Sequence, residues 1–145
     1  MSYENIGLIG FGNWINDAYL PFINDSEEIN ISHISTKTQT SLDKSKIIFG
    51  DSLNYSLNYQ NLIKDESLDL IILSVPDEMH GEILEEILDV NIDCVIEMPL
   101  TSKNQNAKKL ISKIESQNNL IIPNLEMSYL PIVDYLKSII EEKKY

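Results

Sequence analysis

Ile6-Gly7-Leu8-Ile9-Gly10-Phe11-Gly12 is the stretch that decides the fold. A short apolar run that ends in two closely spaced glycines is typical of a buried strand that enters a tight turn. A helix is expected after the turn, with Pro21 at a start or kink because proline has no amide hydrogen to donate. Gly10 permits the tight turn, and Gly12 lets a pyrophosphate approach the backbone amides that begin the helix.

The turn itself is therefore a candidate binding site for a phosphate-containing ligand. We predict that the ligand contacts five successive residues, which are Gly10, Phe11, Gly12, Asn13 and Trp14. The third position of such a turn is usually Gly or Ala, so that helix and strand pack closely, and here it is Ile15. This residue predicts a helix further from the sheet and an altered phosphate cradle. The alternative is a strand–helix turn that binds no ligand.

Predicted strands and helices alternate along the rest of the chain. Further strands are expected at 29–35, 53–55, 68–75, 94–97 and 120–123. Helices are expected at 14–23, 42–49, 59–64, from 76, after a cap at Thr101 or Ser102, and from near Pro131. This alternation predicts an α/β fold with a doubly wound parallel sheet of the Rossmann type, as one domain over residues 1–145.

Composition narrows the function classes. Eleven Lys and Arg residues against 23 Asp and Glu residues give a net charge of −12, which disfavours nucleic acids and anionic membrane surfaces as partners. Cys94 is the only cysteine and there are two histidines, so no metal site is predicted. No apolar run reaches the length of a membrane span, and residues 1–5 do not resemble a secretory signal, so a cytoplasmic location is expected.

The end of the predicted second strand bears on the choice of ligand. An acidic residue there usually binds the free 2′-hydroxyl of NAD, but this chain has Ser35-Thr36-Lys37-Thr38. Two hydroxyls and a cation suit a 2′-phosphate better, so Ser35, Thr36 and Lys37 favour NADP over NAD. The alternative is an ordinary polar loop.

Five later motifs occur in the order of a known enzyme family. Ser74-Val75-Pro76-Asp77-Glu78-Met79-His80 resembles a (T/S)-P-x-x-x-H motif, and Glu97-Met98-Pro99-Leu100 resembles E-K-P-(L/I). Tyr129-Leu130-Pro131 resembles (F/Y)-x-P, Tyr19-Leu20-Pro21 resembles H-x-P with Tyr for His, and Asn58-Tyr59-Gln60-Asn61-Leu62 resembles D-Y-E-E-L. Over nearly its whole length the chain thus resembles the Gfo/Idh/MocA family (glucose–fructose oxidoreductase and inositol dehydrogenase).

This resemblance implies a nucleotide-binding domain followed by a second α/β domain that supplies most substrate contacts. It implies hydride transfer between a bound NAD(P) and a sugar, polyol or related alcohol. By resemblance His80 faces the nicotinamide and Glu97 lies near the nicotinamide ribose, although a capping or hydrogen-bonding role is the alternative for each. The cofactor-binding residues implied by these two motifs are Ser74, Val75, Pro76, His80, Glu97 and Met98.

Two departures from the family bear on catalysis. Met98 stands where the family has a lysine, and a thioether carries no proton to transfer. The sequence also stops at Tyr145, about where the family's second domain begins. We therefore assign no catalytic residue, and expect a truncated or stand-alone NAD(P)-binding domain that is not a competent dehydrogenase by itself. The alternative is a non-catalytic nucleotide-sensing or protein-binding module.

The last predicted helix carries an apolar surface. In the family it adjoins the second domain, so the surface around Tyr129, Ile132 and Leu136 lacks that cover here. We expect self-association or a partner chain to cover it.

Overall fold

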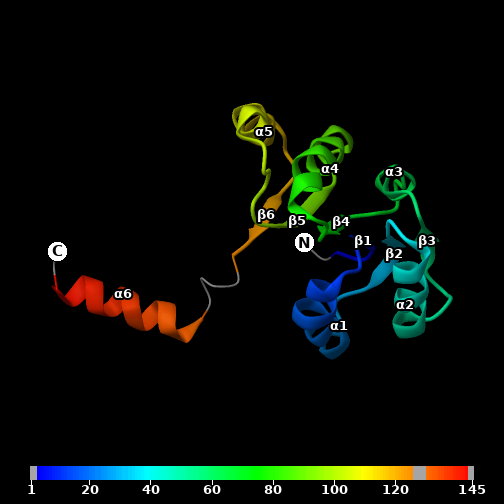
Figure 1. Cartoon of the computed structure of the whole chain (residues 1–145), viewed down its shortest axis with the longest axis horizontal. Coiled ribbons are helices and arrows are strands. Elements are labelled where there is room, and N and C mark those ends of the chain that lie inside the picture. Colours follow the sequence, from blue (N-terminus) through cyan, green and yellow to red (C-terminus); the bar gives the residue numbers. More distant parts are fainter. Residues whose placement is uncertain (1–2, 126–129, 144–145) are drawn as a thin grey trace.

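The structure, a computed structural model, describes residues 3–125 and 130–143 (Figure 1). The strands are β1 (Ile6–Ile9), β2 (Ile31–Ser35), β3 (Asn54–Ser56), β4 (Leu70–Leu73), β5 (Asp93–Glu97) and β6 (Ile121–Asn124). The helices are the π-helical turn η1 (Ile15–Tyr19), α1 (Leu20–Asp25), α2 (Gln39–Phe49), α3 (Tyr59–Ile63), α4 (Asp77–Val90), α5 (Asn104–Ser116) and α6 (Pro131–Lys143).

The six strands form one parallel sheet in the order β3-β2-β1-β4-β5-β6. The chain runs outward from β1 to β3, returns to the middle, and runs outward again from β4 to β6. This arrangement confirms the predicted doubly wound Rossmann-type fold. The order reverses between β1 and β4, and a crevice at the carboxyl ends of these strands is where such folds bind ligands.

Helices cover both faces of the sheet. Figure 1 shows α1 and α2 on one face and α3, α4 and α5 on the other. The central strand β4 supplies both layers of the core, because Ile71 and Leu73 join the cluster under α4 while Leu70 and Ile72 join the cluster under α1. Burial of both faces agrees with the unbroken apolar run that predicted this strand.

Two helix starts differ from the sequence prediction. The helix expected at 42–49 begins at Gln39, because the Thr38 side chain accepts the Ser41 amide hydrogen at 3.2 Å and caps it. The helix for which Thr101 or Ser102 is the expected cap begins only at Asn104, with Lys103 at the capping position. Thr101 instead accepts the Lys103 amide hydrogen at 3.1 Å, which closes a turn before the helix.

The last helix, α6, stands apart from the sheet in Figure 1. Its apolar side chains are open to solvent: Ile132 is 56% exposed, Tyr135 62%, Leu136 51% and Ile140 64%. Among the described residues no helix combines the length and apolar character needed to cross a bilayer.

Candidate functional site

The glycine turn lies at the carboxyl end of β1, between the ends of β2 and β4. The Gly10 amide donates to the Ser35 carbonyl at 2.8 Å, and the Ser74 amide donates to the Ile9 carbonyl at 2.9 Å. Gly10 has a φ of +95°, and a Cβ atom there would lie 1.9 Å from the Ser74 carbonyl oxygen. No L-residue with a side chain fits at this position, so Gly10 is required by the fold.

Gly12 differs from Gly10 in what surrounds it. A Cβ atom at Gly12 would meet nothing within 4 Å. The space beside this residue is therefore free for a ligand that approaches the backbone, which is the role that the sequence predicts for it. Gly10 is therefore needed for the close packing of the turn, and Gly12 leaves the turn accessible to a ligand.

Ile15 is fully buried and extends the core on the α1 face, beside Leu8, Phe11 and Ile34. The helix that it begins is irregular, since the Leu20 amide donates to the Ile15 carbonyl in a π-helical bond. Ile15 does not line the cavity described next. The side chain at the third position thus lies in the core and leaves the crevice unobstructed.

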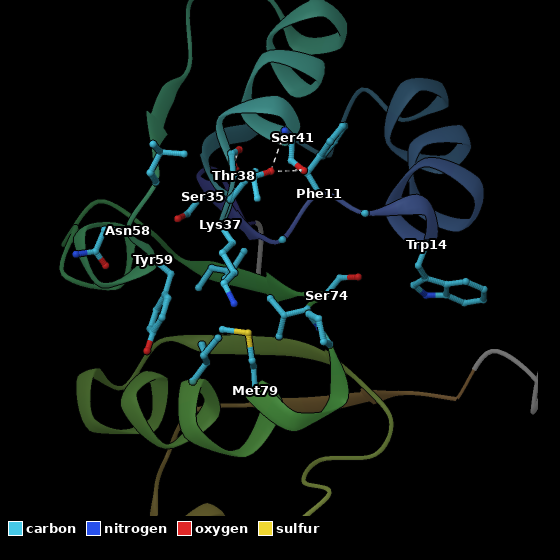
Figure 2. Close-up of a pocket in the computed structure, with 18 of the residues that line it drawn as sticks. Phe11, Trp14, Ser35, Lys37, Thr38, Ser41, Asn58, Tyr59, Ser74 and Met79 are labelled. Carbon is cyan, nitrogen blue, oxygen red and sulfur yellow. Dashed lines mark hydrogen bonds between the residues drawn. The ribbon is translucent and has the colours of Figure 1, made fainter.

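A cavity of about 550 Å³ opens at the carboxyl ends of β1, β2 and β4 (Figure 2). Its volume is typical of small-molecule pockets, about 300–1,000 Å³. Three predicted stretches, 10–14, 35–37 and 74–76, all line it. The structure therefore brings these residues to one site, while their contacts with a ligand stay predictions. Its other lining residues are Ile9, Thr38, Ser41, Leu57, Asn58, Tyr59, Met79 and Ile83.

Most of the residues that sequence reasoning did not place in the site lie in or next to the first turns of α2, α3 and α4. Thr38 and Ser41 begin α2, and the N-capping threonine is a signal that was available in the sequence. Asn58 and Tyr59 begin α3 inside a motif that marked the family but not the site. Burial and a 2.9 Å hydrogen bond to Glu86 raise the pKa of Tyr59 to about 12, so its phenol stays protonated.

The charge of this cavity is opposite in sign to the charge of the whole chain. Among its lining residues Lys37 is the only charged side chain, although the chain carries a net charge of −12. Figure 2 shows the Lys37 side chain extending into the cavity. The amino end of α2 lies beside it, and helix amino ends favour anions. A phosphate-bearing ligand fits this combination of a cation, hydroxyls and a helix amino end.

A second cavity of about 300 Å³ lies next to the first, at the carboxyl ends of β4 and β5. The two cavities share Trp14, Ser74 and Val75. Trp14 is 43% exposed, and in Figure 2 its indole points away from Thr38 and Ser41, so it leaves the larger cavity open. The remaining residues that line the second cavity are Asp77, His80, Glu97 and Met98.

His80 lies at the wall of the second cavity but is fully buried. Its Nδ1 atom is 2.7 Å from the Pro99 carbonyl oxygen, and its Nε2 atom is 2.7 Å from the Val75 carbonyl oxygen. The ring therefore joins the loop after β4 to the loop after β5. Contact with a nicotinamide stays a prediction for this residue.

Glu97 and Met98 stand at the carboxyl end of β5. The Glu97 carboxylate accepts hydrogen bonds from the Tyr19 hydroxyl and the Asn124 side-chain amide, so its described partners are side chains and not backbone amides. Met98 is 47% exposed, and its thioether offers no proton to a reacting group. In the described part of the chain, no group of three or more His, Cys, Asp or Glu residues is placed to bind a metal ion.

The sheet order, the glycine turn and the crevice at the switch point define a Rossmann-type nucleotide-binding domain. Residues 4–125 match the model of the Gfo/Idh/MocA oxidoreductase family, described as an oxidoreductase family with an NAD-binding Rossmann fold. The chain belongs to this family and carries its NAD(P)-binding domain.

Similar proteins agree with this assignment. An uncharacterized oxidoreductase of Schizosaccharomyces pombe is 30% identical over 87 residues, which cover 60% of this chain and 23% of the relative. A 3-ketoreductase of Actinomadura kijaniata, solved with NADP and TDP-benzene, has the same fold, with a TM-score of 0.82 and 18% identity over 95% of this chain and 42% of its own. Its complex with NADP alone gives a TM-score of 0.80 at 18% identity, over 95% of this chain and 44% of its own. The chain spans less than half the length of these proteins.

Proposed function

We propose that this domain binds NADP in preference to NAD, in the cavity at the carboxyl ends of β1, β2 and β4. The observation that carries the proposal is the charge of that cavity, which is lined by one cation and no carboxylate in a strongly acidic chain. An acidic side chain at the end of β2 would bind a 2′-hydroxyl and repel a 2′-phosphate. Here that end carries Ser35, Thr36 and Lys37, followed by the start of α2.

A Lys37→Ala substitution tests this preference. We expect it to weaken NADPH binding about tenfold and to leave NADH binding within about twofold, because a charge-assisted hydrogen bond to the 2′-phosphate is worth about 1.5–3 kcal/mol. Isothermal titration calorimetry of both cofactors measures the effect. Lys44→Ala, at an exposed position further along α2, is the matched control and should change neither affinity. Equal losses for NADPH and NADH would contradict the preference, and no binding of either cofactor to the native chain would contradict the proposed function.

We further propose that the domain does not transfer hydride by itself. Met98, where the family has its lysine, lies in the second cavity and cannot supply or take up a proton. Activity would require the second, substrate-binding domain of the family, from a longer parent chain or from a partner. Oxidation of sugars or polyols by the purified 145-residue chain with NADP would contradict this proposal.

The second candidate is a non-catalytic module that senses a nucleotide or binds another protein in the cytoplasm. The observation that favours it is α6, whose residues Ile132 and Leu136 are more than half exposed. Exposed apolar faces of this kind usually mark an interaction surface. Tyr129, also placed on this surface by the sequence, lies outside the described residues.

Self-association or binding of a partner chain over α6 gives a measurable expectation. If the chain self-associates, light scattering after size-exclusion chromatography should show a mass that rises with protein concentration. If a partner covers α6, a defined second chain should co-purify with the protein. A Leu136→Lys change should return the protein to a monomer, because it places a charge in the contact. Thr40→Lys, at an exposed position on α2, adds the same charge elsewhere and should not. A strict monomer at high concentration with no partner would refute the expectation.

A further inference from the structure

Three polar side chains from distant parts of the chain meet where β5 and β6 end. Glu97 and Asn124 are the last residues of these strands and are register partners, and Tyr19 is the last residue of η1. The Asn124 side-chain amide donates to Glu97 Oε1 at 2.8 Å and to the Tyr19 hydroxyl oxygen at 3.0 Å. The Tyr19 hydroxyl in turn donates to the same Oε1 atom. All three side chains are partly buried.

This geometry holds the Glu97 carboxylate by one oxygen. Hydrogen bonds to an ionised acceptor are about twice as strong as those between neutral groups, and two donors on one atom restrict the rotation of the group. Within the described residues, Oε2 of Glu97 accepts no hydrogen bond. The carboxylate is thus fixed in orientation while one of its oxygens remains available to a ligand.

Glu97 lies where the nicotinamide half of a bound dinucleotide is expected. It lines the second cavity, which shares the lining residues Trp14, Ser74 and Val75 with the larger cavity and therefore lies next to it. In a doubly wound sheet one nucleotide half lies over β1–β3, and the other crosses the switch point to β4–β6. The half that carries the nicotinamide therefore reaches the end of β5 when the 2′-phosphate lies at α2. Neither Tyr19 nor Asn124 lines this cavity, whereas Glu97, to which both donate a hydrogen bond, does line it.

We propose that Tyr19 and Asn124 are positioning residues, which orient Glu97 so that its Oε2 atom accepts a hydrogen bond from a ribose hydroxyl of the nicotinamide half. This inference rests on the proposed dinucleotide binding and adds two residues to it. It predicts that Tyr19 and Asn124 contribute to the affinity for the nicotinamide half of the ligand, which lies over β4–β6. They should not contribute to the affinity for the half that carries the 2′-phosphate.

Two ligands distinguish the halves: NADPH, and adenosine 2′,5′-bisphosphate, which lacks the nicotinamide and its ribose. We expect Tyr19→Phe and Asn124→Ala each to weaken NADPH binding five- to tenfold and to leave binding of the bisphosphate within twofold. Calorimetry measures both, and thermal unfolding confirms that each variant is folded. Tyr3→Phe is the matched control, because Tyr3 donates to a carboxylate of Asp93 at the opposite end of β5, at 2.7 Å, and should affect neither ligand.

A double-mutant cycle separates positioning from general stabilisation. In a Glu97→Gln background, Tyr19→Phe should have less than half of its effect on NADPH affinity, because both changes act through one contact. The inference fails if the variants weaken both ligands equally, if they weaken neither, or if the effects of Tyr19→Phe and Glu97→Gln simply add. If the native chain binds neither NADPH nor the bisphosphate, the proposed function fails instead.

Discussion

Gly10→Ala should destabilise the domain by about 2–5 kcal/mol, because a left-handed conformation costs an L-residue about 1–2 kcal/mol and overpacking adds about 1–3 kcal/mol. The added methyl would lie 1.9 Å from the Ser74 carbonyl oxygen, so β1 and the loop after β4 would have to separate. Such a loss is a large part of the 5–15 kcal/mol that stabilises a typical domain. Urea unfolding, followed by the fluorescence of the single tryptophan, Trp14, measures it.

Gly50→Ala is the control that separates backbone strain from steric overlap. Gly50 also has a positive φ, +78°, but a Cβ atom there would meet nothing within 4 Å. We expect a loss of only about 1–2 kcal/mol from strain alone. If Gly10→Ala costs no more than Gly50→Ala, the close approach of Gly10 to Ser74 does not hold in solution.

The fold could be predicted from local patterns because each central element has a strong one. The unbroken apolar run that forms β4 indicates burial on both faces, and the glycine turn fixes where the first helix begins. Helix ends were less predictable. Whether Thr101 caps a helix or closes the turn before it depends on the backbone angles of the next residues, which the sequence pattern does not specify.

The candidate site was predictable where its residues belong to continuous motifs. The stretches 10–14, 35–37 and 74–76 follow three strands whose carboxyl ends must meet at one edge of a parallel sheet. The cluster of Tyr19, Glu97 and Asn124 was not predictable as a unit. Its members are brought together by the register of β5 with β6 and by the winding of η1, and neither has a signal in one sequence.

His80 illustrates the same limit for a single side chain. Its place at the start of a helix beside the crevice was evident from the motif, and that place alone suggests a ligand contact. The structure shows its two ring nitrogens next to the carbonyl oxygens of Val75 and Pro99, which come from loops after different strands. A sequence motif specifies which residue is present, but not which of its atoms are already engaged by the fold.

Gly12→Val should strongly weaken dinucleotide binding and leave the fold intact, which is the reverse of the result expected at Gly10. No atom lies within 4 Å of the added Cβ, so we expect the free energy of unfolding to change by less than about 1 kcal/mol, as for surface substitutions. The branched side chain would occupy the space through which a pyrophosphate reaches the backbone amides, and these amides supply much of the affinity of such turns. We therefore expect NADPH binding to weaken by at least a hundredfold, equivalent to about 2.7 kcal/mol.

Calorimetry and urea unfolding on the same samples test the predicted loss of binding and the predicted retention of stability. Binding within threefold of the native chain would show that the phosphates do not pass beside Gly12, and a stability loss as large as that of Gly10→Ala would show that the space beside Gly12 is filled in solution.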